Sequence, residues 1–316
     1  MLVDMKNLSA LESLRLGGSQ PHGNIKDLVD KLPHGITSDK PARAGNFTGS
    51  FYLDLSNNHL TGVIPSDTAC TIPRLWHLDL AGNNLTGPIP LIENSSLSEL
   101  ILRSNKLRGQ IPKLHRNISV LDISINFLSG PLPIDIGSPN LHALILSSSY
   151  LIGQIQESIC ESPQYMLILG LSNNFLEGAF PQCFQMQSLA FLLLCHNSFS
   201  GKLSSFLRNS SVINYVDLSW NKFSGTLPQW IEQMSTSQIL KISTIFSLAA
   251  NNISGAIPLS LSNLRIMTGK HPTILEIDWF QAYIDFVDGS PGGIFSVVMK
   301  HQELQYGDRL IAFLMR

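Results

Sequence analysis

The sequence predicts an α/β solenoid: a right-handed superhelix of stacked coils, with a parallel β-sheet on its concave face and loop or 3-10 returns on its convex face. Two observations support this class. A leucine pattern with period 2 recurs at steps of 21 to 30 residues along most of the 316-residue chain, and an asparagine holds the same place in nearly every copy. One copy alone cannot bury its leucines, whereas stacked copies share a core.

The repeat unit is seen in "LDLSNNHLTGVIP", which begins at Leu53 and recurs as "LDLAGNNLTGPIP" from Leu78 and "VDLSWNKFSGTLP" from Val216. Its general form is L-x-x-L-x-L-x-x-N-x-L-x-G-x-I-P. Ser149 replaces the asparagine in one copy, and a degenerate copy near the N-terminus carries Ser19 there. The asparagine falls at Asn58, Asn83, Asn105, Asn126, Asn174, Asn197, Asn221 and Asn251.

Each position of the template has a physical role. The alternating leucines predict a short strand with an apolar inner face and a variable outer face. The asparagine follows the strand, where its amide can hydrogen-bond backbone groups that would otherwise lack partners, and stacking would turn these bonds into a ladder. Glycine permits the next bend, and proline stiffens the convex return. We therefore expect buried leucines at Leu55, Leu80, Leu102 and Leu218.

The domain organisation follows from where the repeat stops. Residues 1–263 are predicted to form the solenoid of about ten repeats, with an irregular, loop-rich insertion at 26–50. The 30-residue step from Asn221 to Asn251 is too long for one coil and too short for two, so irregular packing is expected there. Residues 264–307 hold no asparagine in phase and form a non-repeat segment, and 308–316 would be the truncated start of a further repeat.

Composition narrows the functional classes. The net charge is −2, which gives no indication of nucleic-acid binding. The N-terminus lacks the basic and apolar regions of a signal peptide, and every apolar run is too short to cross a bilayer, so we expect neither feature in this chain. The sequence shows no known catalytic or phosphate-binding motif, which favours a protein that is not an enzyme and needs no cofactor or metal. His77, His142 and His196 occupy variable strand or turn positions that we expect to face solvent.

Two of the cysteines are predicted to form a disulfide. Cys160 and Cys183 are 23 residues apart, which is one repeat length, and each falls on the convex return of its coil. Adjacent coils would bring them within bridging range. Cys70 and Cys195 have no obvious partner and are interpreted as small packing residues.

The N-x-L-x-G-x-I-P pattern over residues 11–258 resembles the plant extracellular type of leucine-rich repeat, found in receptor-like proteins and receptor-like kinases. The stretch "FSVVMKHQELQYG", residues 295–307, resembles the end of the island segment of receptor-like proteins of the wilt- and mould-resistance type. The resemblance implies a partial receptor ectodomain. In a full-length member the ectodomain is extracellular, an anchor holds the protein in the plasma membrane, and a partner supplies the kinase as co-receptor.

Because this repeat type implies secretion, the N-x-S/T sequons gain meaning. Asn94 and Asn209, each in an "N-S-S" on the convex side, are the first expected N-glycosylation sites. The other predicted sites are Asn84, Asn117 and Asn252.

The resemblance implies an ectodomain that recognises a protein or peptide ligand in defence or developmental signalling, since variable strand residues project from a rigid sheet. The predicted ligand-contact residues on the concave face are His77, Asp79, Glu99, Arg103, Asp122, Tyr215, Asp217 and Trp220. Trp220 and Tyr215 would be anchors by residue type. Two alternatives stay open: a secreted inhibitor of cell-wall-degrading enzymes, and a non-functional truncated gene product.

The ends of the chain suggest that it is a poor stand-alone protein. A solenoid needs polar caps, because a terminal coil otherwise leaves its leucines open to water. We expect fraying from both ends, with protection from hydrogen exchange concentrated in about residues 75–228.

Overall fold

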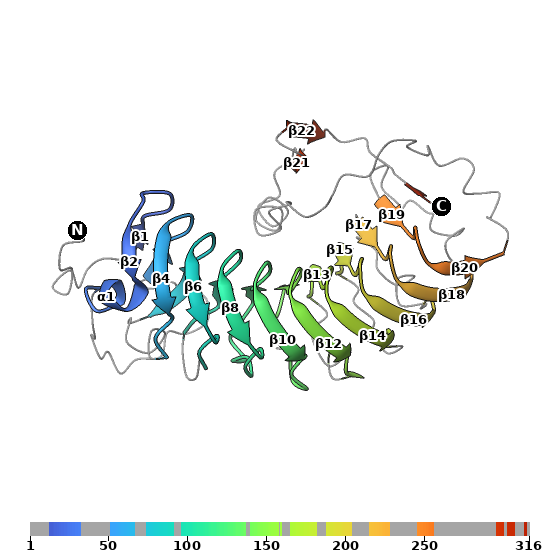
Figure 1. The fold of residues 1–316 in the computed structure, drawn as a ribbon, viewed down its shortest axis with the longest axis horizontal. Helices are drawn as coiled ribbons and strands as arrows, with labels where there is room; N and C mark the ends of the chain where they lie inside the picture. The colour runs from blue at the N-terminus through green and yellow to red at the C-terminus, as the bar shows by residue number, and fades with distance from the viewer. Residues whose placement is uncertain are drawn as a thin grey trace. The chain divides into compact units, whose positions relative to one another are not determined.

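The computed structural model describes residues 13–32, 51–66, 74–91, 96–136, 140–157, 159, 165–181, 188–203, 215–227, 245–255, 295–299, 302–306 and 313–314. The chain divides into two compact units. Unit 1 comprises Met1–Leu141 and Leu146–Ile152, and unit 2 comprises His142–Ile145 and Gly153–Arg316. Each unit is a stack of coils in which parallel strands of successive repeats lie side by side (Figure 1).

Two parallel sheets run along unit 1 (Figure 1). The strands of its first sheet are, in spatial order, β1 (Ser13–Arg15), β3 (Phe51–Asp54), β5 (Leu75–Asp79), β7 (Glu99–Ile101) and β9 (Val120–Asp122). The strands of its second sheet are β2 (His22–Asn24), β4 (His59–Val63), β6 (Asn84–Gly87), β8 (Lys106–Gly109), β10 (Phe127–Pro131) and β12 (Tyr150–Gln154).

Unit 2 repeats this arrangement. The strands of its first sheet are β11 (Ala143–Ile145), β13 (Ile168–Gly170), β15 (Phe191–Leu193), β17 (Tyr215–Asp217), β19 (Ile245–Ser247) and β23 (Phe313–Leu314). The strands of its second sheet are β14 (Phe175–Ala179), β16 (Ser198–Lys202), β18 (Lys222–Thr226) and β20 (Asn252–Ser254). A separate antiparallel hairpin pairs β21 (Phe295–Met299) with β22 (Gln302–Tyr306).

The leucines of the template form the core, as predicted. The exposed fractions of Leu55, Leu80, Leu102 and Leu218 are 0, 1, 1 and 3%. Phe199 is the largest of the fully buried side chains and lies between Phe180 and Phe223, with ring centroids 6.1 and 6.3 Å away. The core of this part of unit 2 therefore contains a row of phenylalanines. Phe199 and Phe223 stand in the position that leucine holds elsewhere, and Phe180 stands in the isoleucine position of the G-x-I-P segment.

The prediction of one strand per repeat is incomplete, because most repeats contribute two. The x-L-x-G-x segment after the asparagine also alternates: in β4, His59 is exposed, Leu60 is buried and Thr61 is exposed again. This segment therefore also points one apolar side chain to the core and its neighbours to solvent, as the first strand does. Its backbone pairs with the equivalent segment of the next coil. The glycine keeps its predicted role, since Gly62 has φ +93°, in the left-handed region that glycine tolerates.

The asparagine ladder is confirmed. Asn83 donates through Nδ2 to the carbonyls of Leu80 and Ala81 in its own coil, at 3.1 and 3.2 Å, and to Leu55 of the preceding coil at 2.9 Å. Its Oδ1 accepts from the backbone N–H of Leu60 at 3.0 Å. Asn58, Asn105, Asn126, Asn197, Asn221 and Asn251 donate to carbonyls of their own and the preceding coil in the same way. Ser149 is too short for this role, and its buried hydroxyl has no hydrogen-bond partner in the described part of the chain.

A second row, which we call the left-handed row, consists of the residue before each ladder position. Every member has φ between +53° and +63°. Its members are Asn57, Gly82, Ser104, Ile125, Ser148, Asn173, His196, Trp220 and Ala250. Glycine, asparagine and histidine are the residues found most often in this conformation, whereas isoleucine and tryptophan are disfavoured, so the coils of Ile125 and Trp220 hold a strained backbone.

Ile125 is the clearest case of this strain, because β-branched residues are the least suited to positive φ. Replacing Ile125 by asparagine is expected to raise the free energy of unfolding by about 1 kcal/mol, since asparagine tolerates the left-handed region. The matched control is Ile152→Asn, at an isoleucine that is 49% exposed and has no positive φ. Denaturant unfolding of both variants is the measurement, and a greater loss of stability in Ile125→Asn than in the control would contradict the assignment.

The structure describes part of each predicted break in the repeat. β17 and β19 are neighbours and Asn251 donates to the carbonyl of Leu218, so the described strands on either side of the 30-residue step pair directly, while residues 228–244 lie outside the described residues. The predicted insertion begins with a helix, α1 (Ile25–Val29), not a loop. Asn24 caps it by accepting from the N–H of Lys26 at 2.9 Å, and its apolar residues lie against β4.

Cys195 is a packing residue, as predicted. It is a free cysteine with an exposed fraction of 6%, and burial, with a smaller contribution from the nearby Asp217 carboxylate, raises the pKa of its thiol to about 12. The predicted pair Cys160 and Cys183 lies outside the described residues and stays a prediction.

The buried thiol predicts two measurable properties. The pKa of Cys195 in the folded chain is higher than the ordinary value of 9.0, so the unfolded chain loses this proton at a lower pH than the folded chain does. The free energy of unfolding therefore falls as the pH rises from 9 towards 12, and this thiol has no effect on it below pH 9.

At pH 8, iodoacetamide should label Cys195 only as fast as the chain opens. Peptide mass spectrometry in buffer and in denaturant measures this, and labelling in buffer at the rate of an unfolded thiol would contradict the burial.

Candidate functional site

A row of polar and aromatic side chains lies on the outer face of the first sheet in unit 1, which is the face opposite the buried leucines. The strand register places Tyr52 beside His77, and His77 beside Glu99. The rings of Tyr52 and His77 are stacked, with centroids 4.0 Å apart and planes 5° from parallel. The guanidinium of Arg15 lies 4.6 Å from the centre of the Tyr52 ring. We call Arg15, Tyr52, His77 and Glu99 the outer row.

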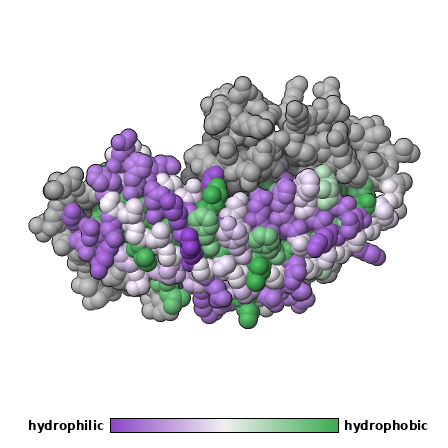
Figure 2. Space-filling model, viewed as in Figure 1, coloured by the Kyte–Doolittle hydropathy of each residue, from purple (hydrophilic) through white to green (hydrophobic). Residues whose placement is uncertain are grey.

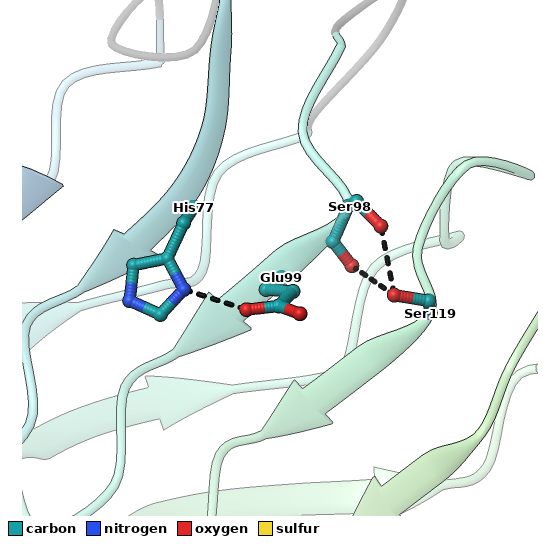
Figure 3. A network of polar contacts seen from close by, with 4 residues as sticks. All are labelled: His77, Ser98, Glu99 and Ser119. Carbon is teal, nitrogen blue, oxygen red and sulfur yellow. Dashed lines mark hydrogen bonds and ion pairs between the residues drawn. The ribbon is translucent and has the colours of Figure 1, made fainter. Parts of the chain in front are cut away.

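Hydrogen bonds fix the far end of the outer row (Figure 3). His77 Nδ1 lies 2.7 Å from Glu99 Oε2, and the Glu99 side chain is 20% exposed. The adjacent Ser98 and Ser119 hydroxyls are 2.7 Å apart, and Ser119 also donates to the Ser98 carbonyl at 3.2 Å. Glu99 therefore presents a carboxylate held in place on one side by an imidazole, with a serine pair on the neighbouring backbone.

A register irregularity adds a third ring to this surface. The pairing of β3 with β5 shifts between Phe51 and Tyr52, and this leaves Trp76 as the extra residue. The Trp76 ring lies 5.9 Å from that of Tyr52 and 5.6 Å from that of His77, tilted by 58° and 59°. The three rings form one aromatic cluster bordered by Arg15.

Burial raises the pKa of the Tyr52 hydroxyl. Loss of hydration is the main cause, and the Asp54 carboxylate adds to it, while Arg15 acts in the opposite direction. The outer row thus combines a phenol hydroxyl, the Glu99 side chain and the Arg15 guanidinium, a set suited to recognising polar and aromatic groups of a partner.

Three of the eight predicted contact residues are not exposed. The exposed fractions of His77, Asp122 and Asp217 are 1, 1 and 3%. The expectation that His77 faces solvent is wrong, because Tyr52, Trp76 and Glu99 surround its ring. Asp122 and Asp217 are structural: each accepts from the N–H and the hydroxyl of the serine two residues later, with the hydroxyl bond at 2.6 Å.

The remaining predicted residues reach the surface to different extents. Asp79, Glu99, Arg103 and Tyr215 are half-buried, whereas Trp220 is 58% exposed. Burial and the Asp217 carboxylate raise the pKa of Tyr215 well above its ordinary value. Two of the eight, His77 and Glu99, lie within hydrogen-bonding distance of each other, at 2.7 Å.

The outer face of the first sheet in unit 2 differs from that of unit 1. On its first three strands, β11, β13 and β15, the variable side chains are apolar and buried, with exposed fractions of 1% for Ile145, 0% for Ile168, 4% for Phe191 and 1% for Leu193. Because these side chains are buried, they cannot contact a ligand in this conformation. The exposed side chains visible in Figure 2 are mostly hydrophilic, with hydrophobic ones in separate patches.

Sequence reasoning missed Arg15, Tyr52 and Trp76. Tyr52 occupies the strand position equivalent to His77 and Glu99, so the repeat alignment alone could have identified it. Arg15 lies in the degenerate first copy, and Trp76 reaches the surface through a register irregularity that the template does not contain.

Three of the five predicted N-glycosylation sites lie among the described residues. Asn117 and Asn252 are exposed and Asn84 is half-buried, whereas Asn94 and Asn209 lie outside the described residues.

Within the described ranges, no three His, Cys, Asp or Glu side chains are placed to hold a metal ion. No helix among the described residues is long and apolar enough to cross a membrane.

Comparison with known proteins agrees with this geometry. The Leucine Rich Repeat family model matches residues 51–70, 74–94 and 213–234. Together with the stacked parallel strands and the asparagine ladder, this makes the chain a leucine-rich repeat solenoid. Its sequence relatives then place it among the plant leucine-rich repeat receptor-like proteins, of which it represents a part.

Two of its sequence relatives are receptor-like proteins of Arabidopsis and tomato. The chain is 30% identical to Receptor-like protein 54 of Arabidopsis thaliana over 248 residues, which is 69% of this chain and 27% of that protein. It is 35% identical to Receptor-like protein EIX2 of Solanum lycopersicum over 127 residues, 39% of this chain and 12% of that protein. The chain thus spans about a quarter or less of these relatives.

Two receptor ectodomains share the fold. The ectodomain of the Arabidopsis receptor kinase HAESA, solved with an IDA peptide hormone ligand, has a TM-score of 0.66 and 27% identity, and the match covers 82% of this chain and 41% of that one. A TDR receptor structure has a TM-score of 0.67 and 26% identity, with 83% and 51% covered.

Proposed function

We propose that this chain is part of the extracellular ligand-recognition region of a plant receptor-like protein, and that the outer row of unit 1 contacts a peptide or protein ligand. The observation that carries this proposal is the outer row itself. Arg15, Tyr52 and Glu99 combine a cation, a ring and a carboxylate on a rigid sheet, whereas the template residues around them are buried.

The comparisons support this class of function. HAESA binds a peptide hormone with an ectodomain of the same fold, so a solenoid of this kind can present a peptide-binding surface. We further propose that the full-length protein is anchored in the plasma membrane, signals in defence or development, and works with a kinase-bearing co-receptor. Asn84, Asn117 and Asn252 are proposed to carry glycans in the secreted form, since each lies in a sequon and reaches the surface.

The first test is selection of a random twelve-residue peptide library on the secreted chain. Peptides that enrich and bind in solution would support a peptide-recognition function. Failure of every enriched peptide to bind the folded chain would count against it.

The second test is substitution within the outer row. Glu99→Ala and Tyr52→Ala are expected to weaken binding of a selected peptide by about tenfold or more, because truncating a central aromatic or charged contact typically costs that much. The control is Glu177→Ala, at an exposed glutamate of β14 in the second sheet. Calorimetric titration of the three variants is the measurement, and equal affinities would contradict the assigned surface.

A further inference from the structure

The left-handed row contains an exposed aromatic pair in unit 2. Trp220 is 58% exposed, and its ring is stacked on that of His196 in the preceding coil, with centroids 5.3 Å apart and planes 11° from parallel. Both residues have positive φ, +54° and +55°, where asparagine, glycine, serine or alanine stands in most other coils. A bulky exposed tryptophan held in a disfavoured backbone conformation points to a role other than folding.

The stack ends abruptly at the next coil. The backbone N–H of Trp220 donates to the carbonyl of Ala249 at 2.8 Å, and the backbone N–H of Asn221 donates to the carbonyl of Ala250 at 3.2 Å, so the coil of Ala250 lies directly against that of Trp220. Ala250 occupies the next place in the left-handed row, with φ +53°. Adjacent strands are about 4.8 Å apart, close to the spacing of stacked rings. Among the described residues, the next place in the row after Trp220 is therefore occupied by a methyl group, where a third ring would fit.

The charges beside this position favour an acidic partner. In the coils that carry His196 and Trp220, the described residues include one acidic side chain, Asp217, which is buried and bonded to Ser219. Lys202 and Lys222 are exposed in these coils. Lys222 follows Trp220 by two residues, whereas the Lys202 side chain lies beside Gly225, further along β18. A cation stacked on Trp220 would be repelled by Lys222, whereas a carboxylate next to the ring would be attracted.

We propose that Trp220, stacked on His196 and open above Ala250, is a ring-binding site for a peptide segment in which an aromatic or prolyl ring is flanked by carboxylates. This inference rests on the proposed function, since it assigns the chemistry of a peptide ligand. The ring would complete the stack above Ala250, and a neighbouring carboxylate would pair with Lys222.

The test uses the whole secreted chain and a capped pentapeptide with one tyrosine between two pairs of aspartates. Two variant peptides carry alanine in place of tyrosine, or lysine in place of aspartate. Trp220→Asn is expected to weaken binding of the acidic tyrosine peptide by about tenfold or more, while its melting temperature stays equal or rises because asparagine suits positive φ. Ala250→Phe, which fills the open position with the chain's own ring, should block binding to a similar extent. Phe175→Ala, at another exposed ring of unit 2, is the control and should bind normally.

Several results would overturn the proposal. These are equal binding by wild type and Trp220→Asn, equal binding of the tyrosine and alanine peptides, and no binding of the tyrosine peptide to wild type. Tighter, Trp220-dependent binding of cellohexaose would reassign the site to a saccharide and also overturn it. If the proposed function itself is wrong, no peptide from the random library binds the folded wild-type chain. If only the ring-binding site is wrong, library peptides still bind but do not depend on Trp220.

Discussion

Replacing Asn83 by alanine is expected to lower the free energy of unfolding by about 3–5 kcal/mol. The amide of Asn83 donates to three carbonyls and accepts from the N–H of Leu60, and the side chain is 7% exposed. Alanine would leave these four backbone groups without this partner inside the protein, where water reaches them poorly. Chemical denaturation followed by circular dichroism is the measurement.

Two further variants separate hydrogen bonding from size. Asn83→Asp keeps the shape but sets a carboxylate against three carbonyl oxygens, so it should be more destabilising than Asn83→Ala at neutral pH. Asn140→Ala removes an exposed asparagine whose Nδ2 donates to the Arg116 carbonyl at 3.1 Å, and should cost less than about 1 kcal/mol. If Asn83→Ala costs no more than Asn140→Ala, the ladder does not stabilise the coils as described.

Replacing Phe199 by alanine is expected to lower the free energy of unfolding by about 3–5 kcal/mol. Phe199 is fully buried, and its ring contacts Phe180 edge-on and Phe223 in a stacked arrangement. Alanine would leave a cavity between two coils that the flanking rings cannot close without moving the backbone. The melting temperature and the denaturant midpoint should both fall.

The matched control is Phe127→Ala. Phe127 is 41% exposed and is stacked on Tyr150 at 6.2 Å, so its loss should cost less than about 1 kcal/mol. Phe199→Leu should lie between the two, because leucine is the residue that other coils use at this position. A Phe199→Ala variant as stable as Phe127→Ala would show that the phenylalanine row is not a core.

The repeat could be predicted from the sequence because each position of the template has one physical requirement. Leucine at Leu55 and Leu80 must be buried, and the asparagine at Asn83 must satisfy backbone groups, whatever the rest of the chain does. Local rules of this kind repeat in every coil, so one reading of the template predicts most of the solenoid. The position of Glu99 at the surface follows from the same periodicity.

The site was harder to predict because it depends on neighbours in adjacent coils. His77 occupies a variable position, but Tyr52 and Glu99 enclose it from both sides, and this could not be read from the coil of His77 alone. Asp122 was predicted to face a ligand, yet Ser124 two residues later binds its carboxylate inside the turn. The second strand of each repeat was missed because the asparagine and glycine were interpreted as a turn and a bend.

The most direct test of the account is photo-cross-linking of a peptide selected on the secreted chain, with benzoylphenylalanine scanned through the peptide and the cross-linked residues mapped by mass spectrometry. We expect cross-links in unit 1 at β3, β5 and β7, on outer-row side chains such as Tyr52 and Glu99. Cross-links confined to the returns around residues 111–118, with none on these strands, would contradict the assignment of the outer face of the first sheet as the recognition surface.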